Sequence, residues 1–204
     1  GNTQLFAVIP AAGQSRRMGR PKLLLPVGDR SLISRVIETF RHPEIAATVV
    51  VTRQSDVDLQ QELAQTFARV VTPDIDPPHM RDSIELALDE IERTFRPLAT
   101  DGWILCPADH PLLDRDILAE LLTAWQNSPT PIQVPVYGGK RGHPVFFRWE
   151  TVADLRSLPG DVGVNALLKQ RPELVTTVDV DDEGILIDLD TPADYDKLCR
   201  RWSS

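Results

Sequence analysis

Residues 7–26 read AVIPAAGQSRRMGRPKLLLP and join two apolar runs through a loop of small and basic residues. The first apolar run, residues 5–9, predicts a buried strand, and the loop after it opens with Ala-Ala-Gly. Glycine lets the backbone approach a ligand closely, and exposed backbone N–H groups beside arginine and lysine suit a phosphate chain. Two familiar phosphate motifs are excluded, because Gly19 is not followed by Lys-Ser or Lys-Thr and Gly13 has no glycine two places on. The stretch therefore predicts a phosphate-binding loop of another kind.

The spacing of this loop resembles the signature of the MobA-like nucleotidyltransferases, L-A-A-G-x-S-x-R-M-G-x-x-K. The positions in register are Ala11, Ala12, Gly13, Ser15, Arg17, Met18, Gly19 and Lys22. Pro10 departs from the pattern, because that family usually has leucine there. The resemblance implies that the small residues and Ser15 bind the nucleotide, while Arg17 and Lys22 stabilise the triphosphate and the leaving pyrophosphate. The alternative interpretation is a glycine turn with solvated basic side chains.

Composition limits the classes of protein that this chain fits. It has 204 residues, 42% of them hydrophobic and 25% charged, which is typical of a globular protein. The net charge of −8 argues against a protein that coats nucleic acid, since such a protein needs a basic face. With only two cysteines and no C-x-x-C pair, the chain fits a reduced, cytoplasmic protein without structural zinc. No signal peptide or membrane-spanning apolar run appears, so we expect no membrane partner.

The order of apolar runs and helical patterns predicts an α/β fold, with a mainly parallel sheet and helices on both faces. Expected strands and helices alternate through residues 5–9, 31–40, 48–52, 55–67, 68–72, 82–96, 102–106 and 114–125. Strands around a glycine-rich hairpin, two short helices, a late strand pair at 174–180 and 184–189, and a last helix after Thr191 complete the chain. The resemblance implies a three-layer, Rossmann-like sheet of the nucleotide-diphospho-sugar transferase type. We expect one nucleotidyltransferase domain over residues 1–204, with residues 138–180 as a substrate-facing lobe.

Three aspartates are the expected metal ligands. Asp109 follows an expected strand in C-P-A-D-H-P-L-L, which resembles the family motif P-A-D-Q-P, and the resemblance implies that it holds Mg²⁺. Asp188 and Asp190 occur in I-D-L-D-T-P, which resembles D-x-D-T-P, and alternation along a strand would put both carboxylates on one face. We favour Asp190 as a direct ligand and Asp188 as a ligand or a supporting residue. The alternatives are a helix cap or turn role for each aspartate, and His110, which replaces the usual glutamine, is either a substrate contact or a solvent-facing turn residue.

Further motifs face the substrates in the resembled family. Gly142-His143-Pro144 resembles G-H-P-x-x-F, so His143 is expected to contact a phosphate or pterin, unless it is a hairpin histidine with no role. Ser83 matches the serine of G-M-x-x-S-L, which cups the nucleotide, and the alternative is a first-turn helix serine with no such role. His79 replaces the glycine of that motif, and Asn165 replaces the arginine of G-D-x-G-x-R. These departures weaken the substrate assignment more than the reaction class.

The A-A-G, P-A-D-x-P and G-H-P motifs look more like the molybdenum cofactor cytidylyltransferase branch than the guanylyltransferase branch. The resemblance implies transfer of CMP from CTP to molybdopterin cofactor with release of pyrophosphate, followed by a molybdoenzyme as recipient of the product. No general base is evident, and an anionic phosphate nucleophile needs none. The alternatives are a nucleotidyltransferase that uses GTP or another acceptor such as a sugar phosphate, and a non-catalytic carrier of molybdenum cofactor.

Overall fold

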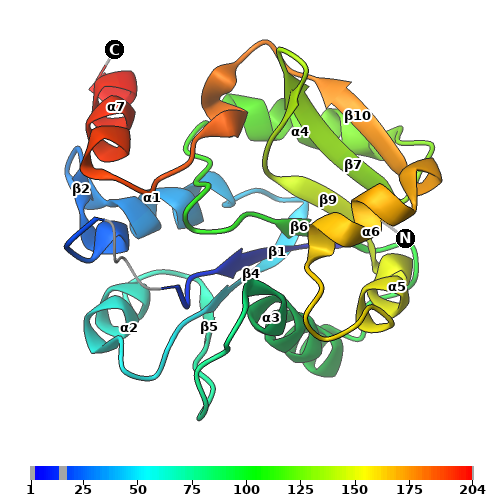
Figure 1. The fold of residues 1–204 in the computed structure, drawn as a ribbon, viewed down its shortest axis with the longest axis horizontal. Coiled ribbons are helices and arrows are strands. Elements are labelled where there is room, and N and C mark those ends of the chain that lie inside the picture. The colour runs from blue at the N-terminus through cyan, green and yellow to red at the C-terminus, as the bar shows by residue number, and fades with distance from the viewer. Residues whose placement is uncertain (1–2, 14–17, 204) are drawn as a thin grey trace.

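The computed structural model describes residues 3–13 and 18–203. Among these residues a mixed sheet of eight strands runs in the order β10-β7-β9-β6-β1-β4-β5, with β8 paired to β7 (Figure 1). The strands of this sheet are β1 Leu5–Pro10, β4 Ile45–Val51, β5 Arg69–Val71, β6 Gly102–Leu105, β7 Ile132–Tyr137, β8 Lys140–Arg141, β9 Val145–Arg148 and β10 Val175–Asp179. A separate two-stranded hairpin, β2 Pro26–Val27 and β3 Arg30–Ser31, lies between η1 and α1 in the chain.

Strand β1 lies inside the sheet and every one of its residues is buried. It pairs in parallel with β4 on one side and with β6 on the other, and β4 pairs in parallel with β5. The carboxyl ends of these four strands therefore meet at one edge, which is where open α/β sheets bind ligands. Antiparallel β9 separates β6 from β7, so the sheet is mixed and mostly parallel.

Helices cover both faces of the sheet, as the alternating pattern predicts (Figure 1). Because side chains alternate along a strand, Ala7 and Ile9 of β1 pack into one hydrophobic cluster while Phe6 and Val8 pack into the other. The first cluster includes residues of α1 Leu32–Thr39, α2 Val57–Leu63, α4 Arg115–Gln126 and α7 Pro192–Ser203. The second includes residues of α3 Met80–Phe95, α5 Val152–Arg156 and α6 Val164–Gln170. Short 3₁₀ turns are η1 Lys22–Leu24, η2 Trp149–Thr151, η3 Pro172–Leu174 and η4 Glu183–Leu186.

Several helix starts follow the expected capping chemistry. Ser31 accepts a hydrogen bond from the Ser34 backbone N–H at 3.2 Å, and Asp56 accepts one from Leu59 at 3.3 Å. Before α7, the Thr191 hydroxyl accepts from the Asp194 N–H at 3.3 Å while the Asp194 carboxylate accepts from the Thr191 N–H at 2.8 Å. This reciprocal pair satisfies N–H groups that the helix itself cannot bond.

The prediction of a second late strand at residues 184–189 is wrong. That segment begins as the 3₁₀ turn η4, and β10 pairs with β7 instead. Its backbone groups bond elsewhere: the Gly184 N–H donates to Asp182 and the Ile185 carbonyl accepts from the His143 N–H. Strand alternation therefore does not set the directions of Asp188 and Asp190.

Asp114 occupies the N-cap position of α4, but its side chain makes no capping hydrogen bond. Asp114 instead forms an ion pair with Arg201 at 3.0 Å, which ties the start of α4 to the last helix. Among the helices of residues 3–13 and 18–203, none has the length and apolar character needed to span a membrane.

Candidate active site

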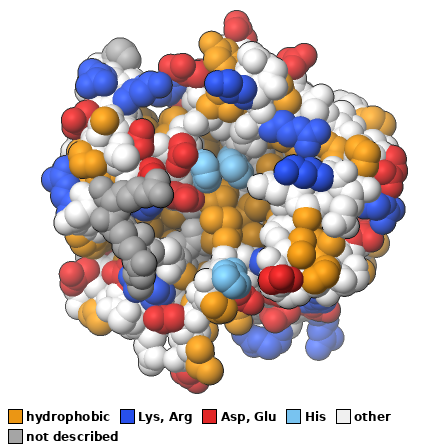
Figure 2. All heavy atoms as spheres, in the orientation of Figure 1, with side chains coloured by type: hydrophobic (Ala, Val, Ile, Leu, Met, Phe, Trp, Pro, Cys, Tyr) orange, Lys and Arg blue, Asp and Glu red, His pale blue; other side chains and the backbone are white. Residues whose placement is uncertain are grey.

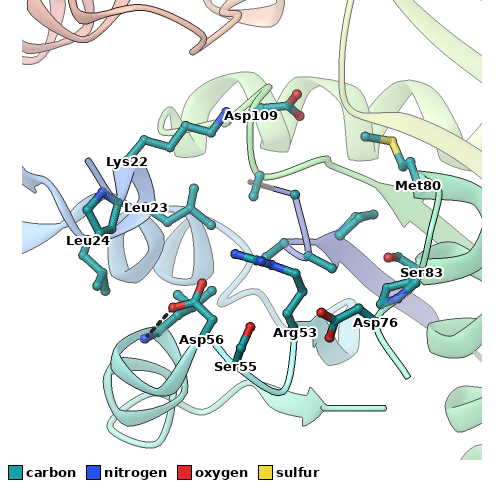
Figure 3. A pocket seen from close by; sticks show the side chains of 18 of the residues that line it. Lys22, Leu23, Leu24, Arg53, Ser55, Asp56, Asp76, Met80, Ser83 and Asp109 are labelled. Atoms are coloured by element: carbon teal, nitrogen blue, oxygen red, sulfur yellow. Dashed lines mark hydrogen bonds between the residues drawn. The ribbon is translucent and has the colours of Figure 1, made fainter. Parts of the chain in front are cut away.

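A pocket of about 890 Å³ opens at the carboxyl edge of the sheet (Figure 3). The segments that follow β1, β4, β5 and β6 all contribute to its wall, together with the start of α3. The lining includes Ala11, Ala12, Gly13, Arg20, Lys22, Arg53, Ser55, Asp76, His79, Ser83, Asp109 and Asp190. The structure therefore has a pocket at the edge of the sheet where the topology predicts a ligand-binding site.

The loop after β1 is held at its start by hydrogen bonds to the end of β4 and to the segment that follows β6. The Ala11 N–H donates to the Val51 carbonyl at 2.8 Å, and the Ala108 N–H donates to the Pro10 carbonyl at 3.0 Å. Gly13 has open space where a Cβ would stand, and Gly19 adopts φ +73°, a conformation that favours glycine. The expected nucleotide contacts at Ser15 and Arg17 lie outside the described residues.

Lys22 connects this loop to two other segments of the pocket. Its Nζ donates to the Leu189 carbonyl at 3.0 Å, and the Leu189 N–H donates to the Asp109 carbonyl at 2.7 Å. Figure 3 shows the Lys22 side chain extended toward Asp109. The next residue, Asp190, lines the same pocket, and its N–H donates to Asp194 at 2.9 Å. The structure thus brings together Lys22, Asp109 and Asp190, which are far apart in the sequence.

Asp109 also belongs to a cluster of metal-ligating groups. One ligand atom each of Asp109, His110 and Asp188 lies within 4.8 Å of the other two. Carboxylate oxygens and an imidazole nitrogen at this separation form a donor set that fits one divalent cation. Asp188 reaches the cluster from outside the pocket lining, whereas Asp190 faces the pocket. Asp109, His110 and Asp188 therefore fit a divalent metal, whereas Asp190, the ligand favoured from the sequence, is not a member of this cluster among the described residues.

His143 lies beside this cluster and is not among the residues that line the pocket. Its ring stacks on that of His110, with centroids 4.5 Å apart and planes 24° apart. Burial, with a smaller contribution from His110, lowers the pKa of His143 to about 4, so the ring is neutral at pH 7. Figure 2 shows two adjacent histidine side chains beside acidic ones near the centre of this face. His143 can therefore act as a neutral hydrogen-bonding group, and its contact with a substrate stays a prediction.

The start of α3 forms the opposite wall. Ser83 is buried in the first turn and lines the pocket, and the His79 N–H donates to the Asp82 carboxylate at 3.0 Å. Asn165, which replaces the arginine of the resembled motif, is exposed on α6. The role of Ser83 as a nucleotide contact stays a prediction, although its position is compatible with it.

Arg53 is a pocket residue that the sequence analysis missed. It follows β4, and its carbonyl accepts hydrogen bonds from Gln60 Nε2 at 2.9 Å and from the Asp56 N–H at 3.1 Å. Its side chain reaches into the middle of the pocket in Figure 3, and its buried Nε has no hydrogen-bond partner among the described residues. The available signal was a basic residue directly after a parallel strand, but no quoted motif includes it.

Comparison with protein families identifies a match over residues 7–175 with the MobA-like NTP transferase domain. A purine catabolism protein, PucB, of Bacillus subtilis (strain 168) is 28% identical, with 98% of each chain covered. A molybdenum cofactor guanylyltransferase of Rhizobium meliloti (strain 1021) is 34% identical over 70% of this chain and 62% of its own. A molybdenum cofactor cytidylyltransferase of Escherichia coli (strain K12) is 22% identical over 96% of each.

Solved structures share the same fold. Rv0371c from Mycobacterium tuberculosis H37Rv superposes with a TM-score of 0.78 at 25% identity, covering 98% of this chain and 99% of that one. A complex of Rv0371c with manganese superposes with a TM-score of 0.74 at 26% identity, covering 97% and 99%.

Proposed function

Because the chain belongs to the MobA-like NTP transferase family, we propose that this nucleotidyltransferase moves CMP from CTP to molybdopterin cofactor and releases pyrophosphate. The observation that carries the proposal is the convergence of Lys22, Asp109 and Asp190 on one pocket at the carboxyl edge of the sheet. The A-A-G loop, the P-A-D motif and G-H-P favour the cytidylyltransferase branch. Similarity along nearly the whole length to the cytidylyltransferase of Escherichia coli supports the same choice.

The residues of the loop would bind and align the nucleotide. Backbone amides at Ala12 and Gly13 border the pocket, where they can donate to phosphate oxygens. Lys22 places a positive charge at the same wall, with Arg17 as its expected partner, so that charge growing on the leaving pyrophosphate is neutralised. A terminal phosphate nucleophile is already anionic, so the protein has mainly to hold it in line with the α-phosphorus.

A divalent metal fits the carboxylates beside this loop, and the similar protein Rv0371c has been solved in complex with manganese. Asp109 would hold Mg²⁺ together with Asp188, whose carboxylate lies in the same cluster, and Asp190, which lines the same pocket, would be a further ligand or support. When bound, the ion would polarise and align the nucleotide phosphates. The Leu189 N–H donates to the Asp109 backbone carbonyl, which holds the backbone of Asp109 beside the segment that carries Asp188 and Asp190.

The acceptor would approach from the side of residues 138–180. This segment contains β8, β9, α5 and α6, and it places His143 next to His110 and so beside Asp109. A neutral His143 can donate one hydrogen bond to the acceptor without adding charge. The alternative within the same reaction class is transfer of GMP from GTP, which the similarity to the guanylyltransferase of Rhizobium meliloti favours.

The test measures pyrophosphate release with Mg²⁺ and either CTP or GTP, with molybdopterin cofactor or a sugar phosphate as acceptor. We expect turnover with CTP and molybdopterin cofactor, and at least a hundredfold loss in Asp109→Ala, because the expected metal ligand is gone. Asp116→Ala is the matched control, since Asp116 is an exposed aspartate on α4 away from the pocket lining. Faster pyrophosphate release with GTP than with CTP would instead assign the chain to the guanylyltransferase branch. No pyrophosphate release with any pair of nucleotide and acceptor would favour a non-catalytic carrier of molybdenum cofactor.

A further inference from the structure

His110 lies within the cluster of metal-ligating groups. It stands where the resembled motif P-A-D-Q-P has glutamine, and one of its ring nitrogens lies within 4.8 Å of carboxylate oxygens of Asp109 and Asp188. Glutamine could offer a cation only an amide oxygen, whereas histidine offers a nitrogen. The replacement therefore changes the chemistry of the donor set and not only its shape.

The hydrogen bond of His110 leaves one ring nitrogen available as a ligand. Its Nδ1 lies 3.2 Å from the Ile187 carbonyl, and a carbonyl oxygen can only accept, so Nδ1 carries the proton. In the neutral ring Nε2 then holds the free lone pair. Metal-ligating histidines commonly donate their other N–H to a backbone carbonyl in this way, because the bond fixes both the tautomer and the ring orientation.

The same segment of chain fixes the other members of the cluster. Ile187 precedes Asp188, so the carbonyl that orients His110 and the second carboxylate move together. The His110 ring also stacks on the ring of His143. The backbone N–H of His143 donates to the Ile185 carbonyl at 2.9 Å, so the same segment also holds His143 in place. The imidazole is thus held by packing and by hydrogen bonding, which is the preorganisation that a ligand requires.

We propose that His110 supplies a nitrogen ligand beside the carboxylates of Asp109 and Asp188, so that this site prefers first-row transition ions such as Mn²⁺ over Mg²⁺. The inference rests on the metal site of the proposed function and names the chemical class of its ion. Mg²⁺ takes oxygen ligands and keeps several waters, whereas imidazole best suits the later first-row ions Fe²⁺, Ni²⁺, Cu²⁺ and Zn²⁺. Mn²⁺ is the weakest binder of that series and serves here as its paramagnetic probe. Mg²⁺ can still bind through the carboxylates, but it gains little from His110.

The experiment titrates the nucleotide-free protein with Mn²⁺ alone and with Mg²⁺ alone, by loss of the free Mn²⁺ electron paramagnetic resonance signal and by calorimetry. We expect Mn²⁺ to bind the wild type at least tenfold more tightly than Mg²⁺. In His110→Gln the Kd of Mn²⁺ should rise about tenfold while the Kd of Mg²⁺ changes less than about twofold. His42→Gln is the matched control, because the His42 ring also bonds to backbone, at the Glu44 N–H, yet lies outside the cluster.

A second readout does not depend on the folding of a variant. Pulsed electron paramagnetic resonance of Mn²⁺ on the wild type should show nitrogen couplings that change when histidine is labelled with ¹⁵N. Absence of these couplings, or equal Mn²⁺ affinity in wild type and His110→Gln, would overturn the inference. If the nitrogen couplings are absent but Asp109→Ala abolishes pyrophosphate release, the proposed function is supported and this inference is wrong. If Mn²⁺ is bound by nitrogen but no substrate pair gives turnover, this inference is supported and the proposed function is wrong.

Discussion

Arg53 carries a buried polar group that the described residues do not satisfy. Its Nε has no hydrogen-bond partner there, although buried donors in native structures nearly always have one. The guanidinium lies in the pocket, across from the wall that contains Lys22 and Asp109 (Figure 3). A nucleotide offers paired acceptors, on its phosphates or on a base edge, that suit the planar fork of arginine.

We therefore expect Arg53→Met to raise the KM for the nucleotide about tenfold or more while kcat changes little, since a hydrogen bond to a charged group contributes about 1.5–3 kcal/mol. Steady-state kinetics with the preferred nucleotide measure this. Arg93→Met is the control, because Arg93 is exposed on α3 and pairs only with Glu90 among the ion pairs of the described chain. An unchanged KM in Arg53→Met would mean that solvent satisfies Nε and that the side chain is structural.

The part of the site that the sequence predicts is the part encoded in short contiguous motifs. Lys22 and Asp109 each follow a recognisable strand, so topology alone places them at the same edge. Asp190 reaches the pocket for a different reason from the one expected, because long-range bonds to Lys22 and Asp109 hold Leu189 and no strand is involved. The contact of His110 with Ile187 and the position of Arg53 depend on tertiary packing, so no local pattern reveals them.

At the scale of elements, Arg81 joins the start of α3 to the segment between α5 and α6. The side chain is only 6% exposed, and its guanidinium donates to the carbonyls of Leu155 at 2.9 Å, Val162 at 3.1 Å and Pro159. These carbonyls lie at the helix end and turn that carry the resembled G-D-x-G motif. The geometry of that turn therefore depends on one buried cation from the helix that also bears Ser83.

We expect Arg81→Met to lower the free energy of unfolding by about 3 kcal/mol, because it leaves buried carbonyls without donors. Arg156→Met should cost less than about 1 kcal/mol. It provides a matched comparison, because Arg156 also links α5 to α3, through Asp89 at 2.9 Å and Glu92 at 2.6 Å, but its side chain is 37% exposed. Urea denaturation of both variants measures the difference, and equal losses would show that burial of the guanidinium adds nothing to the link.

The sequence predicts the elements whose apolar residues recur with a clear helical or strand period. It does not predict the elements whose conformation depends on hydrogen bonds to residues far away in the sequence. The helix α1 follows from the shared face of Leu32, Val36 and Ile37 and from the cap at Ser31. The segment after Asp182 has an apolar pattern that suits a strand equally well, but its hydrogen bonds go to a turn and to His143, so it forms η4. The hairpin of β2 and β3 is too short to leave a periodic signal.

At the scale of the whole molecule, the two hydrophobic clusters pack on opposite faces of one sheet. The rate at which the Cys106 thiol reacts with a labelling reagent therefore measures how often this sheet opens. Cys106 follows β6, is fully buried in the first cluster, and its N–H donates to the Val8 carbonyl at 3.0 Å. Burial, with a smaller contribution from Asp109, raises the pKa of this thiol to about 12. Because the thiolate is the reactive form, native Cys106 is protonated and inert at pH 8.

The last prediction concerns this thiol in Cys199→Ser, which leaves Cys106 as the only cysteine. At pH 8 we expect a disulfide reagent to label it at least about a thousandfold more slowly than in the unfolded chain, because labelling requires the sheet to open. As urea increases, labelling should rise together with the loss of helical circular dichroism, since both clusters pack on the same strands. Labelling well below the unfolding transition would instead show that the segment carrying Asp109 opens by itself, which would make the metal site a locally unstable part of the fold.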